Sequence, residues 1–192
     1  LETIISSPDS TTWYDNYGNT LINIQKTHLN YNSDLNLFSP QNEYGSHPIS
    51  GISWYGANMF ATYMGWELPS VEQWQYIARG DSINWIYPYE DGYAINETQA
   101  NYGNDPGTFA TTQIGSFSEN SRMEAKDIVG NVWQFTKTLH PSINNYILVG
   151  GSYQSSIENI CLNETCFTTT FPSIVSSTFG FRCITEIFYN AP

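Results

Sequence analysis

The stretch Asp127-Ile-Val-Gly-Asn-Val-Trp-Gln-Phe-Thr136 decides more of the fold than any other part of this sequence. Apolar residues flank Gly130-Asn131, a pair that turns a chain tightly because both residue types tolerate a left-handed backbone. Together the apolar side chains can bury on the order of several hundred Å². We therefore predict a buried turn that leads into a strand, with Trp133 as the large aromatic anchor of the core.

Length and charge limit the class of protein. The 192 residues fit one domain, because this length already allows a sizeable core. Acidic residues outnumber basic ones by 18 to 6, and the formal net charge is −12. Such a field repels nucleic-acid phosphates and anionic membranes, so we expect no nucleic-acid partner. The sequence has no apolar run of about 18 residues, and we expect no membrane insertion.

The amino-terminal part alternates short apolar clusters with polar turns. Leu21-Ile-Asn-Ile24 is typical of a strand, and the preceding Tyr17-Gly-Asn-Thr20 is typical of a hairpin turn. The segment from Asn30 to Pro48 shows little periodicity. We predict an ordered but irregular loop there.

Two short helices are predicted in tandem. Ser53 can cap the first, which Gly65 ends, and Ser70-Val-Glu-Gln73 has the form of a capping box that opens the second. The second helix runs through Trp74 to Gly80. The apolar face of the first helix is predicted to consist of Trp54, Ala57, Ala61 and Met64.

The carboxyl-terminal third has two predicted strands around a long polar excursion. Residues 145–153 form a buried strand that runs into a Gly-Gly bend, and Phe179 to Phe188 resumes a strand. Residues Gln154 to Thr178 between them are rich in Ser and Thr and lack periodicity. Binding loops are commonly held between rigid elements in this way.

Two groups of residues are candidates for special chemistry. Cys161, Cys166 and Cys183 all lie near the end of the chain, so either one disulfide and a free thiol or three reduced thiols are expected. A thiol metal site between Cys161 and Cys166 is a further alternative. The loop from Ala100 to Gly107 offers Asn and Asp oxygens of the kind that calcium prefers, although the same residues commonly form a turn.

Several motifs occur in the order found in the formylglycine-generating enzyme (sulfatase-modifying factor) family, which this chain resembles. The resemblance implies an α+β fold of the C-type lectin type, with two short helices, a twisted antiparallel sheet and much irregular structure. It covers residues 47–183 of a single predicted domain, 1–192, and leaves residues 1–46 unmatched. The motifs are Pro48-Ile-Ser-Gly-Ile-Ser-Trp54, Leu68-Pro-Ser-Val-Glu-Gln-Trp-Gln-Tyr-Ile-Ala-Arg-Gly80, Tyr87-Pro88, Ala100-Asn101, Ile114-Gly-Ser-Phe117, Asp127-Ile-Val-Gly-Asn-Val-Trp133, Gly150-Gly-Ser-Tyr153 and Gly180-Phe-Arg182.

Catalytic members of that family resemble copper-dependent oxidases that convert a sulfatase cysteine into formylglycine with two cysteines five positions apart. The first of these cysteines follows the Gly-Gly-Ser-aromatic motif by two residues, and here that position is Ser155. Two soft thiolates are needed to hold Cu(I), so a serine removes one ligand. Cys161 and Cys166 are also five apart and form the alternative catalytic pair.

Non-catalytic relatives with the same fold include variable ligand-binding proteins that retroelements diversify. Their varied residues lie between the Gly-Gly-Ser and Gly-Phe-Arg motifs, on a platform that faces solvent. Side chains of this polar and aromatic kind suit adaptable recognition. The resemblance implies a ligand-binding surface made of Tyr153, Gln154, Ser155, Ser156, Ile157, Glu158, Asn159, Asn163, Thr165, Phe167 and Thr169. The alternative is that this segment is a surface loop that tolerates substitution.

Calcium is the cofactor that the resemblance implies. Family members ligate the ion through positions that match Asn101, Tyr102 and Asp105. A second calcium site of the family needs glycines in the loop before the motif that matches Asp127-Ile-Val-Gly-Asn-Val-Trp133. Residues 120–126 contain no glycine, so we expect this second site to be absent.

From these observations we expect a non-enzymatic ligand-binding domain, displayed outside the cell or on a virion, with a protein or a small polar ligand as its partner. The first alternative is a divergent copper oxidase that uses Cys161 and Cys166. The second is a structural subunit that packs against a partner.

Overall fold

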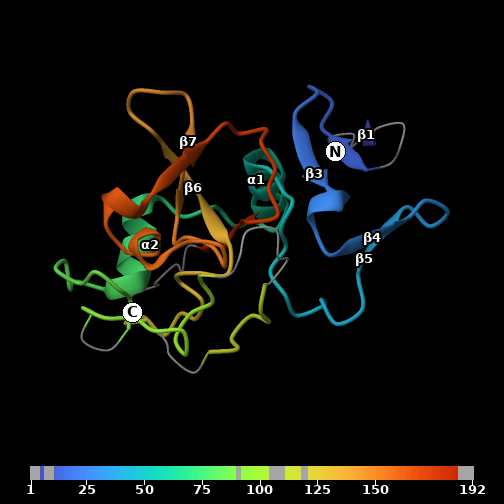
Figure 1. Cartoon of the computed structure of the whole chain (residues 1–192). Coiled ribbons are helices and arrows are strands. Elements are labelled where there is room, and N and C mark those ends of the chain that lie inside the picture. Colours follow the sequence, from blue (N-terminus) through green and yellow to red (C-terminus); the bar gives the residue numbers. More distant parts are fainter. Residues whose placement is uncertain (1–4, 7–10, 90–91, 104–110, 118–120, 186–192) are drawn as a thin grey trace, which may run out of the picture.

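The computed structural model describes residues 5–6, 11–89, 92–103, 111–117 and 121–185. Two helices and three small sheets are joined by long irregular segments, as the sequence predicts (Figure 1). No helix within these residues is both long and apolar enough to cross a membrane.

The amino-terminal part forms two small antiparallel sheets. The first has the order β1 (Ile5–Ser6), β2 (Thr12–Tyr14) and β3 (Thr20–Asn23), and a short 3-10 turn, η1 (Ile24–Lys26), follows. The Asp15 carboxylate closes the predicted hairpin turn by accepting the backbone N–H groups of Tyr17 and Asn19 at 2.9 and 2.8 Å.

The prediction of an irregular loop from Asn30 to Pro48 is wrong for its first part. Strands β4 (Leu29–Asn32) and β5 (Leu37–Pro40) pair as an antiparallel hairpin that projects from the body of the molecule (Figure 1). All four residues of β5 are exposed. The periodicity signal is absent because β5 has no buried face to alternate with an exposed one.

Both predicted helices form, and their ends follow the predicted capping residues. In α1 (Trp54–Tyr63) the Ser53 hydroxyl accepts the N–H of Gly56, and in α2 (Val71–Arg79) both bonds of the capping box are present. The predicted apolar face of α1 needs one correction. Ala57 and Ala61 are buried, but Met64 is 43% exposed because it already lies at the C-terminal cap.

The central sheet has the strand order β8-β7-β6-β9. β6 (Trp133–Leu139) and β7 (Tyr146–Val149) are antiparallel neighbours, as are β7 and β8 (Thr168–Thr170). β9 (Phe179–Gly180) pairs with β6 in parallel. β9 is therefore shorter than the predicted strand from Phe179 to Phe188. Beyond it only Ile184 bridges to Glu67, and residues 186–188 lie outside the described part.

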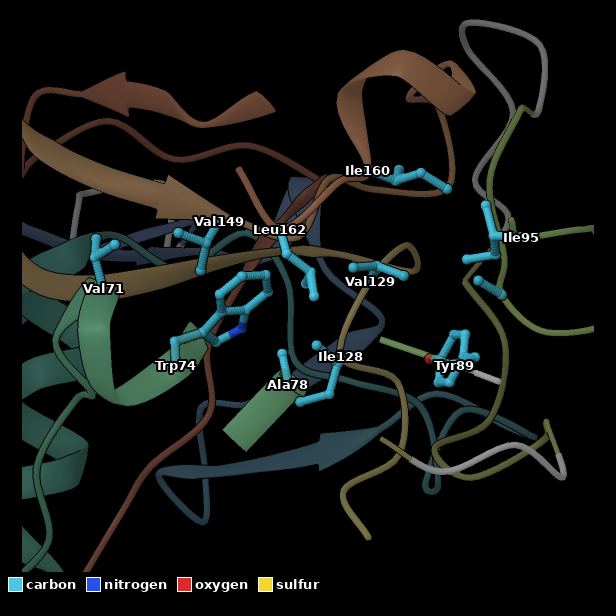
Figure 2. Close-up of a cluster of buried hydrophobic side chains, with 11 residues drawn as sticks. Val71, Trp74, Ala78, Tyr89, Ile95, Ile128, Val129, Val149, Ile160 and Leu162 are labelled. Carbon is cyan, nitrogen blue, oxygen red and sulfur yellow. The ribbon is translucent and has the colours of Figure 1, made fainter. Parts of the chain in front are cut away.

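The main core cluster lies between α2, the turn at Gly130-Asn131, which we call the central turn, and the carboxyl-terminal loop that follows Gly151 (Figure 2). Trp74 of α2 has no exposed surface and is the largest fully buried side chain. The prediction that Trp133 anchors this core is wrong. Trp133 is half-buried and packs at the edge of a second cluster around Phe135. The predicted turn is present, with φ of +76° at Gly130 and +63° at Asn131.

A polar hub joins the helix, the sheet and the Gly180-Phe-Arg182 motif. The Gln134 side-chain oxygen accepts the Trp74 indole N–H at 2.9 Å and the Arg182 Nε–H at 2.6 Å. Arg182 also donates to the backbone carbonyls of Lys126 and Asp127. Buried polar atoms of this kind cost little when each has a partner, and the hub fixes the position of α2 over the sheet.

Candidate ligand-binding surface

The Gly-Gly bend after β7 directs the candidate binding loop. Gly150 and Gly151 have φ of +88° and +71°. A Cβ on Gly150 would lie 2.7 Å from the Ile128 carbonyl oxygen, and one on Gly151 would lie 2.5 Å from a methyl group of Ile160. Both positions therefore need glycine, since any side chain would push the loop away from the core.

The first residues of the loop point inward. Tyr153 is fully buried, and its N–H donates to the Asn131 carbonyl at 3.0 Å. The Ser155 hydroxyl accepts the Ser152 N–H at 2.9 Å, while the Ser155 carbonyl accepts the N–H of Gly103 at 2.9 Å. Tyr153 and Ser155 thus fix the shape of the loop and contribute little exposed surface.

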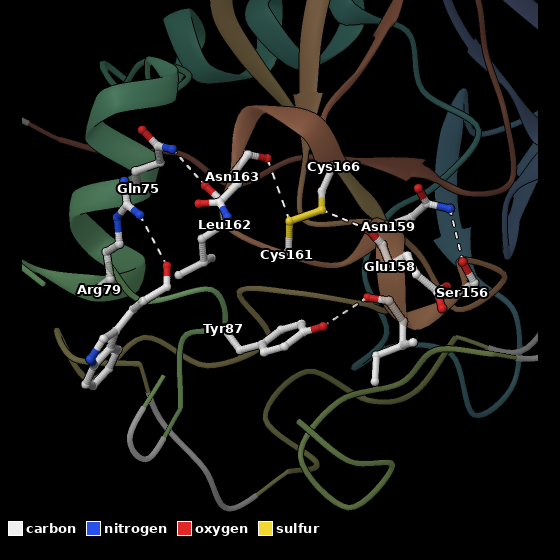
Figure 3. Close-up of a disulfide and its surroundings, with 12 residues drawn as sticks. Gln75, Arg79, Tyr87, Ser156, Glu158, Asn159, Cys161, Leu162, Asn163 and Cys166 are labelled. Atoms are coloured by element: carbon white, nitrogen blue, oxygen red, sulfur yellow. Dashed lines mark hydrogen bonds between the residues drawn. A yellow bond between two sulfur atoms is a disulfide. The ribbon is translucent and has the colours of Figure 1, made fainter. Parts of the chain in front are cut away.

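Cys161 and Cys166 form a disulfide across the loop, with Cα atoms 5.5 Å apart (Figure 3). Cys183 is a half-buried free thiol whose pKa is raised by burial. Of the two expectations for the three cysteines, the structure has the first, one disulfide and one free thiol. Between the cysteines, Leu162 is buried and donates its N–H to the Ile86 carbonyl at 2.8 Å, while its own carbonyl accepts from the Gln75 side chain at 2.7 Å.

The exposed part of the loop lies on both sides of the disulfide. Hydrogen bonding from Ser156 lowers the pKa of the Glu158 carboxyl, and the Tyr87 hydroxyl lies 3.5 Å from the Ile157 carbonyl. Of the predicted binding residues, Gln154, Phe167 and Thr169 are half-buried. The exposed ones, which we call the platform, are Ser156, Ile157, Glu158, Asn159, Asn163 and Thr165.

The predicted calcium ligand Asn101 lies in a buried network beneath the central turn. Its carbonyl accepts the N–H of Asn131 at 2.8 Å, and its side-chain nitrogen lies 3.4 Å from the Asn131 side-chain oxygen. The Asn131 side-chain oxygen also accepts the N–H of Thr112 at 3.0 Å, and its side-chain nitrogen donates to the Thr112 carbonyl at 3.1 Å. This network ties the loop before residue 103 to the central turn.

Comparison with known proteins places these features in a family. Residues 9–187 match the family described as sulfatase-modifying factor enzyme 1-like domain, which is most of the chain. The chain belongs to this family. The match begins well before the motifs recognised in the sequence, so it includes most of residues 1–46.

The curated relatives that the chain matches carry different names. The chain is 27% identical to the serine/threonine-protein kinase Pkn1 of Chlamydia trachomatis, over 90% of this chain and 29% of that protein. It is 26% identical to the inactive C-alpha-formylglycine-generating enzyme 2 of Bos taurus, over 71% of this chain and 49% of that protein. The chain thus spans less than a third of the first relative and about half of the second.

Among solved structures, Treponema denticola variable protein 1 superimposes with a TM-score of 0.61. The two chains are 16% identical, and the match covers 95% of this chain and 91% of that one. At this identity the likeness concerns the fold. It agrees with the predicted C-type lectin type of fold.

The copper chemistry of the family's oxidases does not fit the residues in this loop. The first cysteine position holds Ser155, whose hydroxyl is engaged by the backbone of Ser152. The two remaining loop cysteines, Cys161 and Cys166, are joined to each other and are 5% and 6% exposed. A sulfur in a disulfide carries no thiolate charge and is not a ligand for Cu(I).

Calcium binding stays a prediction. Asn101 is occupied by the network with Asn131, and Tyr102 is half-buried beside it. Asp105 lies outside the described residues. Within the described part of the chain, no group of three His, Cys, Asp or Glu residues is placed to hold a metal ion.

A cavity that the sequence did not predict lies beside the platform. Its volume is about 430 Å³, and three segments far apart in the sequence enclose it. The first turn of α2 forms one wall, the end of the β6–β7 hairpin forms another, and residues 164–169 form the third. Each segment contributes only two to five of the lining residues. The sequence pattern within one segment therefore does not indicate the cavity.

Proposed function

We propose that this domain is a non-enzymatic ligand-binding module whose binding surface is the platform between Gly150-Gly-Ser and Gly180-Phe-Arg. One observation carries the proposal. The loop that holds the catalytic thiolates in the family's oxidases here contains an engaged Ser155 and a disulfide between Cys161 and Cys166.

The construction of the loop supports recognition. The disulfide, the buried Leu162 and the Gly-Gly bend hold the exposed side chains in fixed positions, which lowers the ordering cost when a ligand binds. The platform presents hydroxyl, amide and carboxylate groups beside the exposed Ile157. Such a mixture forms both hydrogen bonds and apolar contacts with a protein or a small polar ligand.

The proposal also covers the location of the domain. Disulfides persist in oxidising surroundings, which supports a place outside the cytosol or on a virion surface. Treponema denticola variable protein 1 shares the fold, and we propose that the platform is diversified in the manner of such variable proteins. Comparing sister genes tests this extension. Variation concentrated at the six platform positions is expected, and uniform variation along the chain argues against it.

A binding experiment with matched variants tests the platform. Purified domain is measured by biolayer interferometry against purified surface proteins and glycans. Asn159→Ala and Thr165→Ala are compared with Asn42→Ala and Thr185→Ala, which remove the same groups from exposed positions elsewhere. We expect a ligand whose affinity falls about tenfold in the first pair and is unchanged in the second. Ligands that lose affinity equally in all four variants would refute the proposal.

The divergent oxidase is the first alternative, and the spacing of Cys161 and Cys166, five positions apart, is the feature that favours it. Reduced protein is incubated with copper and a Cys-x-Pro-x-Arg peptide, and formylglycine is sought by mass spectrometry. We expect no conversion. Conversion that disappears in Cys161→Ala would overturn the non-enzymatic assignment.

A structural subunit is a second alternative, and the aromatic surface of α1 favours it. Tyr17 and Tyr63 are 77% and 79% exposed beside a groove of about 810 Å³ that also contains Met59 and Phe60. Binding lost in Tyr63→Ala and Phe60→Ala, but kept in the platform variants, would support this alternative.

A further inference from the structure

The cavity beside the platform has an apolar floor. Val71 of α2 is 6% exposed, and Ile147 of β7 is half-buried. The half-buried Phe167 ring closes the floor with its centroid 6.0 Å from that of Trp74, in an edge-on arrangement. These side chains belong to or pack against the main core, so the floor is rigid. A rigid apolar floor suits the aliphatic part of a long side chain.

The lining of the cavity contains two acidic residues. Glu72 comes from the first turn of α2 and Glu164 from the loop before β8, and the threonines of β8 line the cavity as well. The Ser70 hydroxyl donates to the Glu72 carboxylate at 2.7 Å, and this hydrogen bond lowers the pKa of Glu72. The carboxylate therefore stays charged at neutral pH. The lining residues are Val71, Glu72, Thr138, Leu139, His140, Pro141, Ile147, Glu164, Phe167, Thr168 and Thr169.

Among the described residues that line the cavity there is no lysine or arginine, so none of them supplies such a cation to the two carboxylates. Lys137 precedes the lining residues of β6 but pairs with Glu67 at 2.8 Å. His140 is the one basic group among the lining residues that the structure describes, and its Nδ1 accepts the N–H of Ser142 at 3.2 Å. The net charge of −12 also draws positively charged partners toward the molecule.

The cavity lies next to a sheet edge. β8 is the end strand in the order β8-β7-β6-β9, so its outer side has no strand neighbour among the described residues. Thr168 and Thr169 of β8 line the cavity. An extended peptide that runs along such an edge places alternate side chains into adjoining pockets.

We propose that this cavity receives a lysine or arginine side chain of a partner protein. The aliphatic stem lies on Val71, Ile147 and Phe167, and the charged end meets Glu72 and Glu164. The inference rests on the proposed binding function and names the partner as a protein with an exposed basic side chain. Binding at the cavity extends the platform, because residues 164–169 belong to the same loop.

The experiment uses the whole domain and capped octapeptides of alternating glycine and lysine. The same peptide with norleucine in place of lysine keeps the stem and removes the charge. Two-dimensional NMR of the labelled domain locates binding and gives the Kd. The variants are Glu72→Gln with Glu164→Gln, and the matched control is Glu97→Gln, an exposed glutamate outside the cavity. Glutamine keeps the size and the hydrogen-bonding oxygen.

We expect the lysine peptide to shift the amide signals of Val71, Ile147 and Phe167. Affinity should fall about tenfold in the double variant, and also as salt is added, while Glu97→Gln has little effect. A norleucine peptide that binds as tightly, or an unchanged Kd in the double variant, would overturn the proposal. Platform variants separate the two ideas. If Asn159→Ala loses ligand binding and the double glutamate variant does not, the proposed binding function of the platform is supported and the proposal of a basic side chain in the cavity is refuted.

Discussion

Removing the disulfide between Cys161 and Cys166 is expected to destabilise the domain by an amount that follows from the size of the ring it closes. The cysteines are five residues apart. Closing so short a loop removes about 7 cal/mol/K of entropy from the unfolded chain, which corresponds to about 2 kcal/mol at room temperature. For a chain of this length, that loss lowers the melting temperature by about 4 to 8 °C.

Chemical denaturation of Cys161→Ala/Cys166→Ala and of the wild type, each with and without reductant, measures this contribution. The wild type should lose about 2 kcal/mol on reduction, and the double variant should be insensitive to reductant. Cys183→Ala is the control, because it removes a thiol that is not in the bridge. Thiol titration of the denatured, unreduced wild type should find one reactive thiol. Three reactive thiols, or a wild type that reductant leaves unchanged, would refute the reasoning.

Three further predictions concern the scaffold. Gln134→Leu removes the oxygen that accepts from both the Trp74 indole and the Arg182 guanidinium. Calorimetry should show that the free energy of unfolding falls by about 3 kcal/mol. Gly130 has a φ of +76°, and Gly130→Ala would place a Cβ against the Asn101 carbonyl. Urea denaturation should show that the free energy of unfolding falls by about 2 kcal/mol. Burial and the charge of His47 lower the pKa of His28 from 6.5 to about 4. The unfolded chain therefore binds the proton first, and the free energy of unfolding should fall as the pH drops from 6.5 to about 4. In His28→Gln this part of the pH dependence should disappear.

Features with a local cause were predictable from the sequence. The capping box at Ser70 and the turn at Gly130-Asn131 each depend on neighbouring residues, and both occur as expected. The hairpin β4–β5 was missed because its residues have no buried face that would produce an alternating pattern.

Features that depend on long-range packing were not predictable. Sequence alone does not show which tryptophan the core encloses, since both Trp74 and Trp133 lie in apolar segments. The answer depends on which side of the sheet α2 covers. The Gln134 side chain bonds Trp74, which lies 60 positions before it, and Arg182, which lies 48 positions after it. No local pattern in the sequence indicates that these three residues are in contact. The acidic cavity escaped notice for the same reason, as it needs the first turn of α2 beside residues 164–169.

Titrating the domain, purified without reductant, with Cu(I) against a competing chelator under anaerobic conditions tests the central claim most directly. Ser155 supplies no thiolate and the sulfurs of Cys161 and Cys166 are joined to each other, so the account predicts that the domain does not take Cu(I) from the chelator in a one-to-one complex. Tight one-to-one binding that is lost in both Cys161→Ala and Cys166→Ala would contradict the account and would make the divergent oxidase the better assignment.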